Sequence, residues 1–389
     1  MKFRALIFLI SGLFLVLSVR TLAQEPIRIG ATMSKTGAYA TQGIPALNGY
    51  KLCQTHINEQ GGILGREIEF LIYNDNSDTD TAIAHYEKLI TEDLVDAVMG
   101  PYGSTLTEAV APVTEKYRMV LISPLAATSS IWEQGRRYLF MVLQPAELFL
   151  AGLIEMAAEQ NLKSVAILQE DALFPKAAGA GAFELATKKG MNVLMHETYA
   201  SGTEDFSPLL TKIKAKNIEV LGVAASSLSD FITITRQMKG LDVNVAMFGT
   251  SGAVNEFKET LGENAEYVYG LSAWEPSLPN PGIEEFVDAY QQEYQQDPSF
   301  HAAGAYGGCQ VFMEAIQRAG SLDSDAIRDV LLNLNTQTIL SHFSVDERGS
   351  QTANTGLFIQ WQDGKKVVVW PEEFATGEIR FPTPTWNER

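Results

Sequence analysis

The sequence is poor in cysteine and in positive charge. Among its 389 residues there are two cysteines, and 29 lysines and arginines stand against 47 aspartates and glutamates, for a formal net charge of −18. Nucleic-acid binding requires a basic surface, so this charge balance argues against a nucleic-acid partner. An acidic surface also disfavours contact with anionic membranes. The sequence has no CxxC pair and no cluster of cysteine and histidine, which argues against a structural zinc site.

Sequence motifs of enzymes are missing as well. The stretch GTSG (249–252) places Ser251 between glycines that are too close for a G-x-S-x-G nucleophile elbow. No histidine stands in an HExxH frame, and there is no Walker A loop and no GxGxxG after a strand. The segment 76–87 has the acidic spacing of a calcium loop, but Thr81 replaces the glycine of its sharp turn. We therefore expect a binding protein that has no catalytic activity, no metal and no cofactor.

The N-terminus has the pattern of a cleavable export signal. Lys2 and Arg4 precede an apolar run at 5–19, and Thr21 and Ala23 stand where a signal peptidase requires small residues. This run is shorter than the roughly 20 residues that a membrane-spanning helix needs. We expect cleavage after Ala23 and export of the mature chain.

Both cysteines lie in the mature chain. An oxidising compartment permits a disulfide between Cys53 and Cys309. The alternative is two separate buried thiols that act as small hydrophobic side chains. The sequence does not set the distance between them, so both alternatives stay open.

Short β-rich runs alternate with helical segments after Ile27. The expected strands of the first series are 27–32, 67–73, 97–100 and 119–123, and its helices are 45–62, 79–92 and one from Ser104 onward. The chain leaves this unit around 136–145, and the strands of a second series are 164–170, 192–199, 220–226 and 245–251. This alternation predicts an α/β fold with doubly wound parallel sheets.

The C-terminal part of the chain is expected to return to the first unit and then to add a final hairpin to the second unit. A second crossing is expected at 267–276, followed by helices at 282–296 and 303–320 and by a hairpin at 357–370 with an Asp-Gly turn. The expected division is a signal peptide at 1–23, a first lobe of 24–143 with 273–340, and a second lobe of 144–272 with 341–389. Lobes joined by several crossings can hinge, and ligands bind at the carboxyl ends of such sheets.

Three expected strands end in turns of small and hydroxyl-bearing residues, at 29–45, 100–104 and 121–130. In the second turn, Ser104 is the expected N-cap of the following helix. Free N–H groups and the helix dipole at such an end attract an anion. Turn propensity explains each segment singly. Together they predict a rim that meets a small anionic or polar ligand.

The run RIGATMSKTGAYATQGIPALNGYKLCQTHINEQGGILGREIEFLIYND, followed by AVMGPYGSTLTEAVAPV and LISPLAATS, resembles the periplasmic leucine/isoleucine/valine-type binding proteins of ABC importers. The resemblance runs in order from about 27 to about 320. It implies a type I periplasmic binding protein fold, with two Rossmann-like lobes and parallel sheets joined by a three-crossing hinge that closes over the ligand. It also implies a periplasmic receptor, expected to be a monomer, that delivers a small molecule to an ABC permease and its ATPase.

The resemblance assigns ligand-binding positions too. At the helix start Ser104 would hold the ligand's carboxylate, and Tyr102 and Gly103 would line the same wall. Further positions match residues that line the family's pocket, although one inserted residue blurs the register after the Ser-Pro turn. They are Gln42, where the family often has tyrosine, Ala126 or Ala127, Thr128, Phe174 in place of a closing aromatic residue, and Ser226.

One position departs from the amino-acid-binding members of this family. Those members place an acid near FGTSGAV to pair with the ligand's ammonium, and this chain has Ser251 there. A buried ammonium without a carboxylate partner is costly. Either Asp171 or Glu275 substitutes for the missing acid, or the ligand is an aromatic or aliphatic carboxylate or an amide that has no α-ammonium.

Two other functions remain as alternatives. A ligand-sensing domain of the same fold would report to a regulatory partner instead of a permease. A secreted hydrolase would need a reactive serine at 104 or 251.

Overall fold

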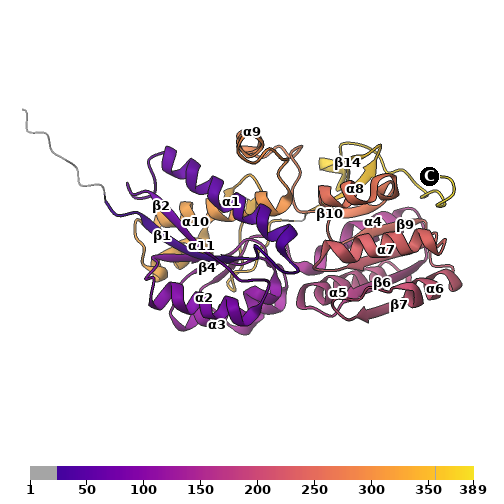
Figure 1. Cartoon of the computed structure of the whole chain (residues 1–389), viewed down its shortest axis with the longest axis horizontal. Coiled ribbons are helices and arrows are strands. Elements are labelled where there is room, and N and C mark those ends of the chain that lie inside the picture. Colours follow the sequence, from indigo (N-terminus) through magenta and orange to yellow (C-terminus); the bar gives the residue numbers. More distant parts are fainter. Residues whose placement is uncertain (1–23, 355) are drawn as a thin grey trace, which may run out of the picture.

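Two central sheets form two lobes side by side (Figure 1). The computed structural model describes residues 24–354 and 356–389, so the expected signal peptide at 1–23 lies outside the described residues. The first sheet is parallel throughout and has the strand order β2-β1-β3-β4-β5. Its strands are β1 (Ile27–Met33), β2 (Ile68–Asn74), β3 (Ala97–Met99), β4 (Leu121–Ser123) and β5 (Leu139–Met141).

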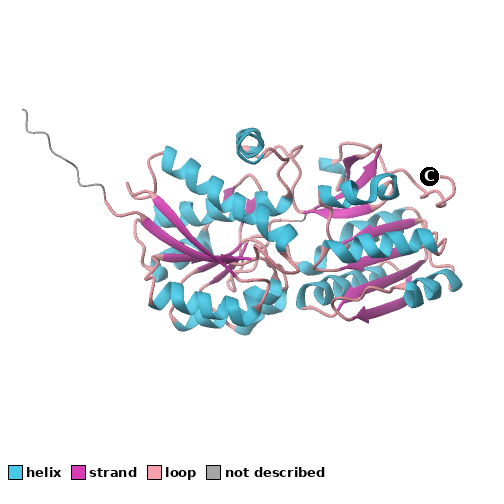
Figure 2. Cartoon of the chain, in the orientation of Figure 1, coloured by secondary structure: helices cyan, strands magenta, loops and turns pink. Residues whose placement is uncertain are grey.

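Helices cover both faces of this first sheet (Figure 2). The helices of this lobe are α1 (Ala40–Glu59), α2 (Thr79–Thr91), α3 (Ser104–Lys116), α9 (Ile283–Tyr294), α10 (Phe300–Ala319) and α11 (Ser324–Asn333). At the start of α2, the Asp78 carboxylate accepts a hydrogen bond of 2.8 Å from the N–H of Thr81. The acidic residues that imitate a calcium loop therefore include the cap of a helix.

The second sheet has the order β14-β13-β10-β9-β8-β6-β7, in which β13 runs antiparallel to both of its neighbours and the other pairs are parallel. Its strands are β6 (Ser164–Glu170), β7 (Asn192–Tyr199), β8 (Val220–Ala224), β9 (Met247–Thr250), β10 (Tyr269–Ser272), β13 (Leu357–Gln362) and β14 (Lys365–Trp370). Its helices are α4 (Ala151–Glu159), α5 (Leu173–Lys188), α6 (Ser207–Ala215), α7 (Leu228–Gly240) and α8 (Asn255–Leu261). Short elements complete the molecule: β11 (Thr336–Gln337), β12 (His342–Phe343) and the 3₁₀ turns Ser129–Gln134, Ala146–Leu148, Gly262–Ala265 and Glu372–Phe374.

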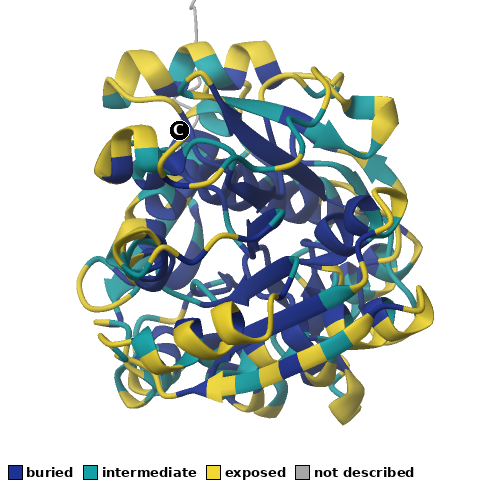
Figure 3. Cartoon of the chain, turned by 90° about the vertical axis from the view of Figure 1, so that its right-hand side faces the viewer, coloured by how far each residue is buried: buried dark blue, intermediate teal, exposed yellow. Residues whose placement is uncertain are grey.

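Burial along the strands follows their place in the sheet. Every residue of the central strand β8 is buried, whereas the edge strand β7 alternates between exposed and more buried positions. A strand covered on both faces needs a continuous apolar run, and an edge strand does not. Figure 3 shows the same division, with buried strands inside and exposed helix faces outside. Within the described residues, no helix has both the length and the apolarity needed to span a bilayer.

The chain passes between the lobes after β5, after β10 and before β13. Residues 136–145, expected only as the first exit, contribute strand β5 before they leave. The N–H of Met141 donates to the Gly349 carbonyl at 2.8 Å, and the Gln351 side chain donates to the Val142 carbonyl at 3.1 Å. These bonds hold 349–351 beside the first sheet. We therefore propose that the first lobe extends to about residue 351, beyond the expected end at 340.

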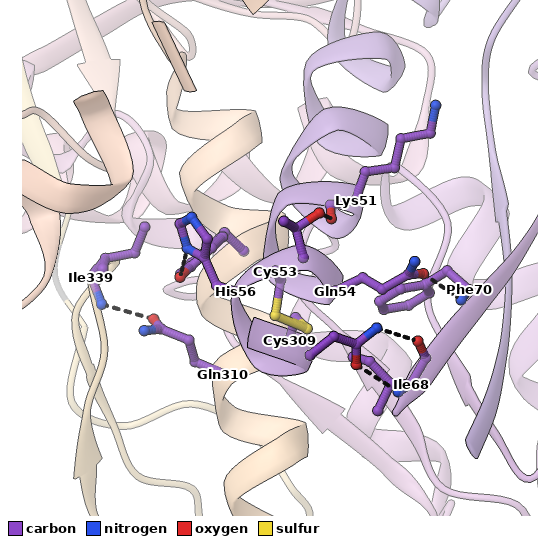
Figure 4. Close-up of a disulfide and its surroundings, with 12 residues drawn as sticks. Lys51, Cys53, Gln54, His56, Ile68, Phe70, Cys309, Gln310 and Ile339 are labelled. Atoms are coloured by element: carbon purple, nitrogen blue, oxygen red, sulfur yellow. Dashed lines mark hydrogen bonds between the residues drawn. A yellow bond between two sulfur atoms is a disulfide. The ribbon is translucent and has the colours of Figure 1, made fainter. Parts of the chain in front are cut away.

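Helices α1 and α10 pack with their backbones in contact. A Cβ atom at Gly49 would lie 2.3 Å from the Ala302 carbonyl oxygen, so only glycine permits this approach. Cys53 of α1 and Cys309 of α10 form a disulfide, with their Cα atoms 6.4 Å apart (Figure 4). The structure thus shows the paired alternative. The bond ties the segment that follows the second crossing to the first helix of the chain.

We expect the double substitution Cys53→Ala with Cys309→Ala to lower the free energy of unfolding by about 2–5 kcal/mol. The reason is that the unfolded chain loses a cross-link between residues 256 positions apart. Urea unfolding followed by circular dichroism measures the change. A similar loss in reduced wild-type protein attributes it to the bond and not to side-chain volume. An unchanged unfolding midpoint in the double variant would contradict this expectation.

Candidate ligand-binding site

A cavity lies between the two lobes. It is lined by residues from the first turns of helices in both lobes, including Gln42 of α1, Ser104 of α3, Phe174 of α5, Phe231 of α7 and His301 of α10. Parallel sheets place the ends of their strands and the starts of the following helices at one edge. The two edges face each other here, so the positive ends of several helix dipoles point at the same space.

Ser104 is the first residue of α3 and not its cap. The N-cap is Gly103, whose φ of +84° favours glycine. The expected cap is therefore wrong by one residue, because the Ser104 hydroxyl oxygen has other partners. It accepts hydrogen bonds from the N–H groups of Ala127 at 3.2 Å and Thr128 at 3.3 Å. A hydroxyl that accepts twice keeps its own proton free to donate, so Ser104 can offer an O–H to an anion in the cavity.

The structure brings most of the predicted site residues to this cavity. Those that line it are Gln42, Tyr102, Gly103, Ser104, Ala127, Phe174, Ser226 and Ser251. Between the two alanines left open by the register, Ala126 belongs to the same buried hydrophobic cluster as Trp132 and does not line the cavity. Thr128 lies behind the lining and contributes its N–H to Ser104. The role of each residue toward a ligand stays a prediction.

Aromatic rings form much of the wall. Phe149 and Phe174 pack edge to face, with 4.8 Å between their ring centres. The ring centre of Tyr102 lies 5.6 Å from that of Tyr39 and 5.4 Å from that of His301. Burial, and to a lesser degree the neighbouring Tyr39, raises the pKa of Tyr102, so this phenol stays protonated.

Sequence reasoning missed several lining residues: Tyr39, Phe149, Phe231, Phe300 and His301. Most of them lie at or near a helix start, and this position was the feature of the sequence that could have identified them. Whether a helix start faces the other lobe depends on how the lobes pack.

Two polar side chains of the lining have buried atoms without a partner. The Gln42 Nε2 donates across the lobes to the Ser226 carbonyl at 3.3 Å, and its Oε1 has no hydrogen-bond partner among the described residues. The same holds for Nδ1 of His301. Burial lowers the pKa of His301 to about 3, with a smaller contribution from Lys366, so the imidazole is neutral near pH 7.

Neither acid expected to replace the missing ammonium partner lines the cavity. Asp171 is exposed and pairs with Lys176 at 2.8 Å, and Glu275 pairs with Lys366 at 3.1 Å. Among the described residues that line the cavity there is no Asp, Glu, Lys or Arg. The interior of the site is therefore uncharged.

A buried carboxylate does lie behind the wall. Glu170 ends β6, and its oxygens accept hydrogen bonds from the Ser226 N–H at 2.8 Å and the Ser201 hydroxyl at 2.6 Å. Burial first and Glu170 second raise the pKa of Tyr39, which places this charge within electrostatic range of the cavity wall. The sequence analysis did not identify Glu170, because this residue is the last one of the strand and not part of the turn that follows it.

The model of a family described as periplasmic binding protein matches residues 26–366. This chain belongs to the periplasmic binding protein family. Among curated relatives, Leu/Ile/Val-binding protein homolog 7 of Brucella suis biovar 1 is 25% identical over 382 residues, covering 92% of this chain and 95% of the relative. Homolog 8 of Brucella abortus is 24% identical over 400 residues, covering 95% and 96%. The family consists of solute-binding proteins of transporters and not of enzymes, and it implies a periplasmic location.

Solved structures share this fold. The leucine-binding protein LivK of Thermotoga maritima has a TM-score of 0.81 at 20% identity, covering 88% of this chain and 97% of that one. LivJ of Streptococcus pneumoniae, in complex with isoleucine, has a TM-score of 0.80 at 25% identity, with coverages of 89% and 100%. A solute-binding protein of Rhodopseudomonas palustris, in complex with 3,4-dihydroxybenzoic acid, has a TM-score of 0.78 at 24% identity, with coverages of 88% and 95%. The expected type I periplasmic binding protein fold is confirmed.

The neutral state of His301 has a measurable consequence. An unfolded histidine titrates near pH 6.5, so below that pH the unfolded state binds more protons than the folded state, and stability is lost as pH falls toward about 3. Between pH 7 and pH 5.5 this residue should lower the free energy of unfolding by about 1 kcal/mol. Urea unfolding at both pH values should show a smaller loss in His301→Phe. Equal losses in the variant and the wild type would argue against a neutral buried imidazole.

Proposed function

We propose that this protein is the solute-binding component of an ABC importer and that its ligand is a small carboxylate without an α-ammonium group. The observation that carries the proposal is the uncharged cavity between the lobes, onto which several helix N-termini converge. Closure of the hinge would enclose the ligand, and the closed form would deliver it to the permease and its ATPase. We also propose that residues 1–23 direct export, that cleavage follows Ala23, and that the mature chain is a monomer.

The carboxylate end of the ligand fits the wall formed by α3. Backbone N–H groups in the first turn of a helix have no acceptor within the helix, and the dipole favours negative charge there. Ser104 adds a hydroxyl whose oxygen already accepts two N–H groups. Hydrogen bonds to a charged partner are about twice as strong as neutral ones, so this wall can hold an anion without a cation.

The opposite wall supports the absence of an α-ammonium. By the sequence resemblance, Ser251 stands where amino-acid-binding members have an acid, and its hydroxyl both accepts from the Ala225 N–H at 3.2 Å and donates to the Ala225 carbonyl at 3.3 Å. The described lining residues supply no carboxylate to an ammonium. Burial of an unpaired ammonium costs several kcal/mol, which disfavours an amino acid relative to its deaminated analogue.

Closure is supported by the contact of Gln42 with Ser226. The donor lies on α1 of the first lobe and the acceptor follows β8 of the second, so the 3.3 Å bond bridges the cleft. A ligand that contacts both walls stabilises this arrangement, because a ligand shifts an equilibrium toward the form that it binds better.

Matched pairs of ligands test the proposed class. We expect 4-methylpentanoate, 3-methylbutanoate and 3-phenylpropanoate to raise the melting temperature of the mature protein more than leucine, valine and phenylalanine, which differ from them by the amino group. At a ligand concentration of 100 Kd the stabilisation is about 2.7 kcal/mol. A shift with the amino acids alone would overturn the amine-free class. In that case loss of the shift in Glu170→Gln would identify Glu170 as the ammonium partner.

Substitution of Ser104 tests the carboxylate wall. For a carboxylate that binds in this panel, Ser104→Ala should raise Kd about 10- to 100-fold, since a hydrogen bond to a charged group contributes about 1.5–3 kcal/mol. Isothermal titration calorimetry measures the change. Ser130→Ala is the matched control, because Ser130 is exposed and outside the cavity lining. An unchanged Kd in Ser104→Ala would place the carboxylate elsewhere.

A further inference from the structure

Two buried polar atoms in the cavity wall have no partner, and neither belongs to the carboxylate wall at α3. One is Oε1 of Gln42 and the other is Nδ1 of His301, and both residues line the cavity. Both side chains are about nineteen-twentieths buried, with relative exposures of 5% each. A buried polar atom left without a hydrogen bond costs about 1–3 kcal/mol. Such atoms in a binding cavity indicate a ligand group that satisfies them.

The Gln42 amide has a defined orientation. Its Nε2 donates to the Ser226 carbonyl, and since nitrogen is the only donor of the amide, the atom left for the cavity is an acceptor. The missing partner of Oε1 is therefore a donor. The surrounding wall supplies none among the described residues.

The His301 ring accepts or donates at Nδ1 according to its tautomer. It is neutral, packs edge to face on Tyr102 at 5.4 Å, and lies 3.9 Å from the ring of Phe300. A charged donor at this end is disfavoured, because no carboxylate lines the cavity within the described residues. A hydroxyl is uncharged, donates once and also accepts. When it donates to Oε1 of Gln42, it can accept a hydrogen bond from His301 in the tautomer that carries its proton on Nδ1.

Resting on the proposed function, we propose that the ligand is a hydroxylated carboxylate, whose carboxylate is held at Ser104 and whose hydroxyl group is recognised by Gln42 and His301. The two side chains come from the N-terminal ends of α1 and α10, and the packing of these two helices holds both ends at the cavity. A hydroxyl bound to Oε1 also holds the amide in the orientation that bridges to Ser226. Recognition of the hydroxyl and closure of the lobes therefore share one side chain.

Calorimetric titration of the mature protein with acids that differ by one hydroxyl tests this assignment. The pairs are 3-phenylpropanoate with 3-(4-hydroxyphenyl)propanoate, and benzoate with 3- and 4-hydroxybenzoate. We expect at least one hydroxylated acid to bind about tenfold or more tightly than its parent, since a site with buried polar groups discriminates against a ligand that leaves them unpaired. In Gln42→Met and in His301→Phe the ratio of the two affinities should fall toward one.

The matched control is Gln60→Met, which removes the same amide from the exposed end of α1 and should keep the wild-type ratio. Equal affinities for parent and hydroxylated acids in the wild type would overturn the inference and leave the proposed function standing. A hydroxyl preference that survives in both Gln42→Met and His301→Phe would also overturn it. Binding of amino acids alone would instead overturn the proposed function and this inference with it.

Discussion

Parallel strand pairing decides where the site lies and what charge it attracts. In each lobe the helices that follow parallel strands begin at the carboxyl edge of the sheet. Because the two edges face each other, the starts of α1, α3 and α10 in one lobe and of α5 and α7 in the other line one cavity. Their dipoles provide a positive environment without any basic side chain. The affinity for an anion that we propose therefore arises from backbone architecture.

This arrangement also explains why the cavity is uncharged in a strongly acidic protein. The acids nearest to the site in sequence are neutralised elsewhere: Asp171 by Lys176 at the surface and Glu275 by Lys366 in the second lobe. Glu170 stays buried but directs its oxygens to Ser226 and Ser201. The remaining wall consists mainly of aromatic rings and hydroxyl groups, and it contains the unpaired Oε1 of Gln42 and Nδ1 of His301. In such a low-polarity space each unsatisfied polar group is costly, and this cost is the physical basis of the specificity that we propose for these atoms.

Most of the local structure was predictable because it depends on short-range patterns. The strands 27–32 and 164–170, the hairpin with its Asp-Gly turn, and a helix that begins at Ser104 all follow from residues within a few positions of one another. Predictions that depended on longer range were less accurate. Within the segment 136–145, residues 139–141 form a fifth strand because they pair with the open edge of β4. The Ser104 hydroxyl does not cap its helix, and it accepts hydrogen bonds from N–H groups of the turn after β4 instead.

The sequence alone determined the alternation of strands and helices, the turns of small residues and the family to which the chain belongs. Local side-chain chemistry and backbone preferences encode all of these. Only the tertiary structure decided that Cys53 pairs with Cys309, that Ala127 and not Ala126 faces the cavity, and that Gln42 reaches Ser226. These facts join residues far apart in the chain. They depend on how the helices and lobes pack, and a short stretch of sequence does not specify which distant residues it contacts in the folded protein.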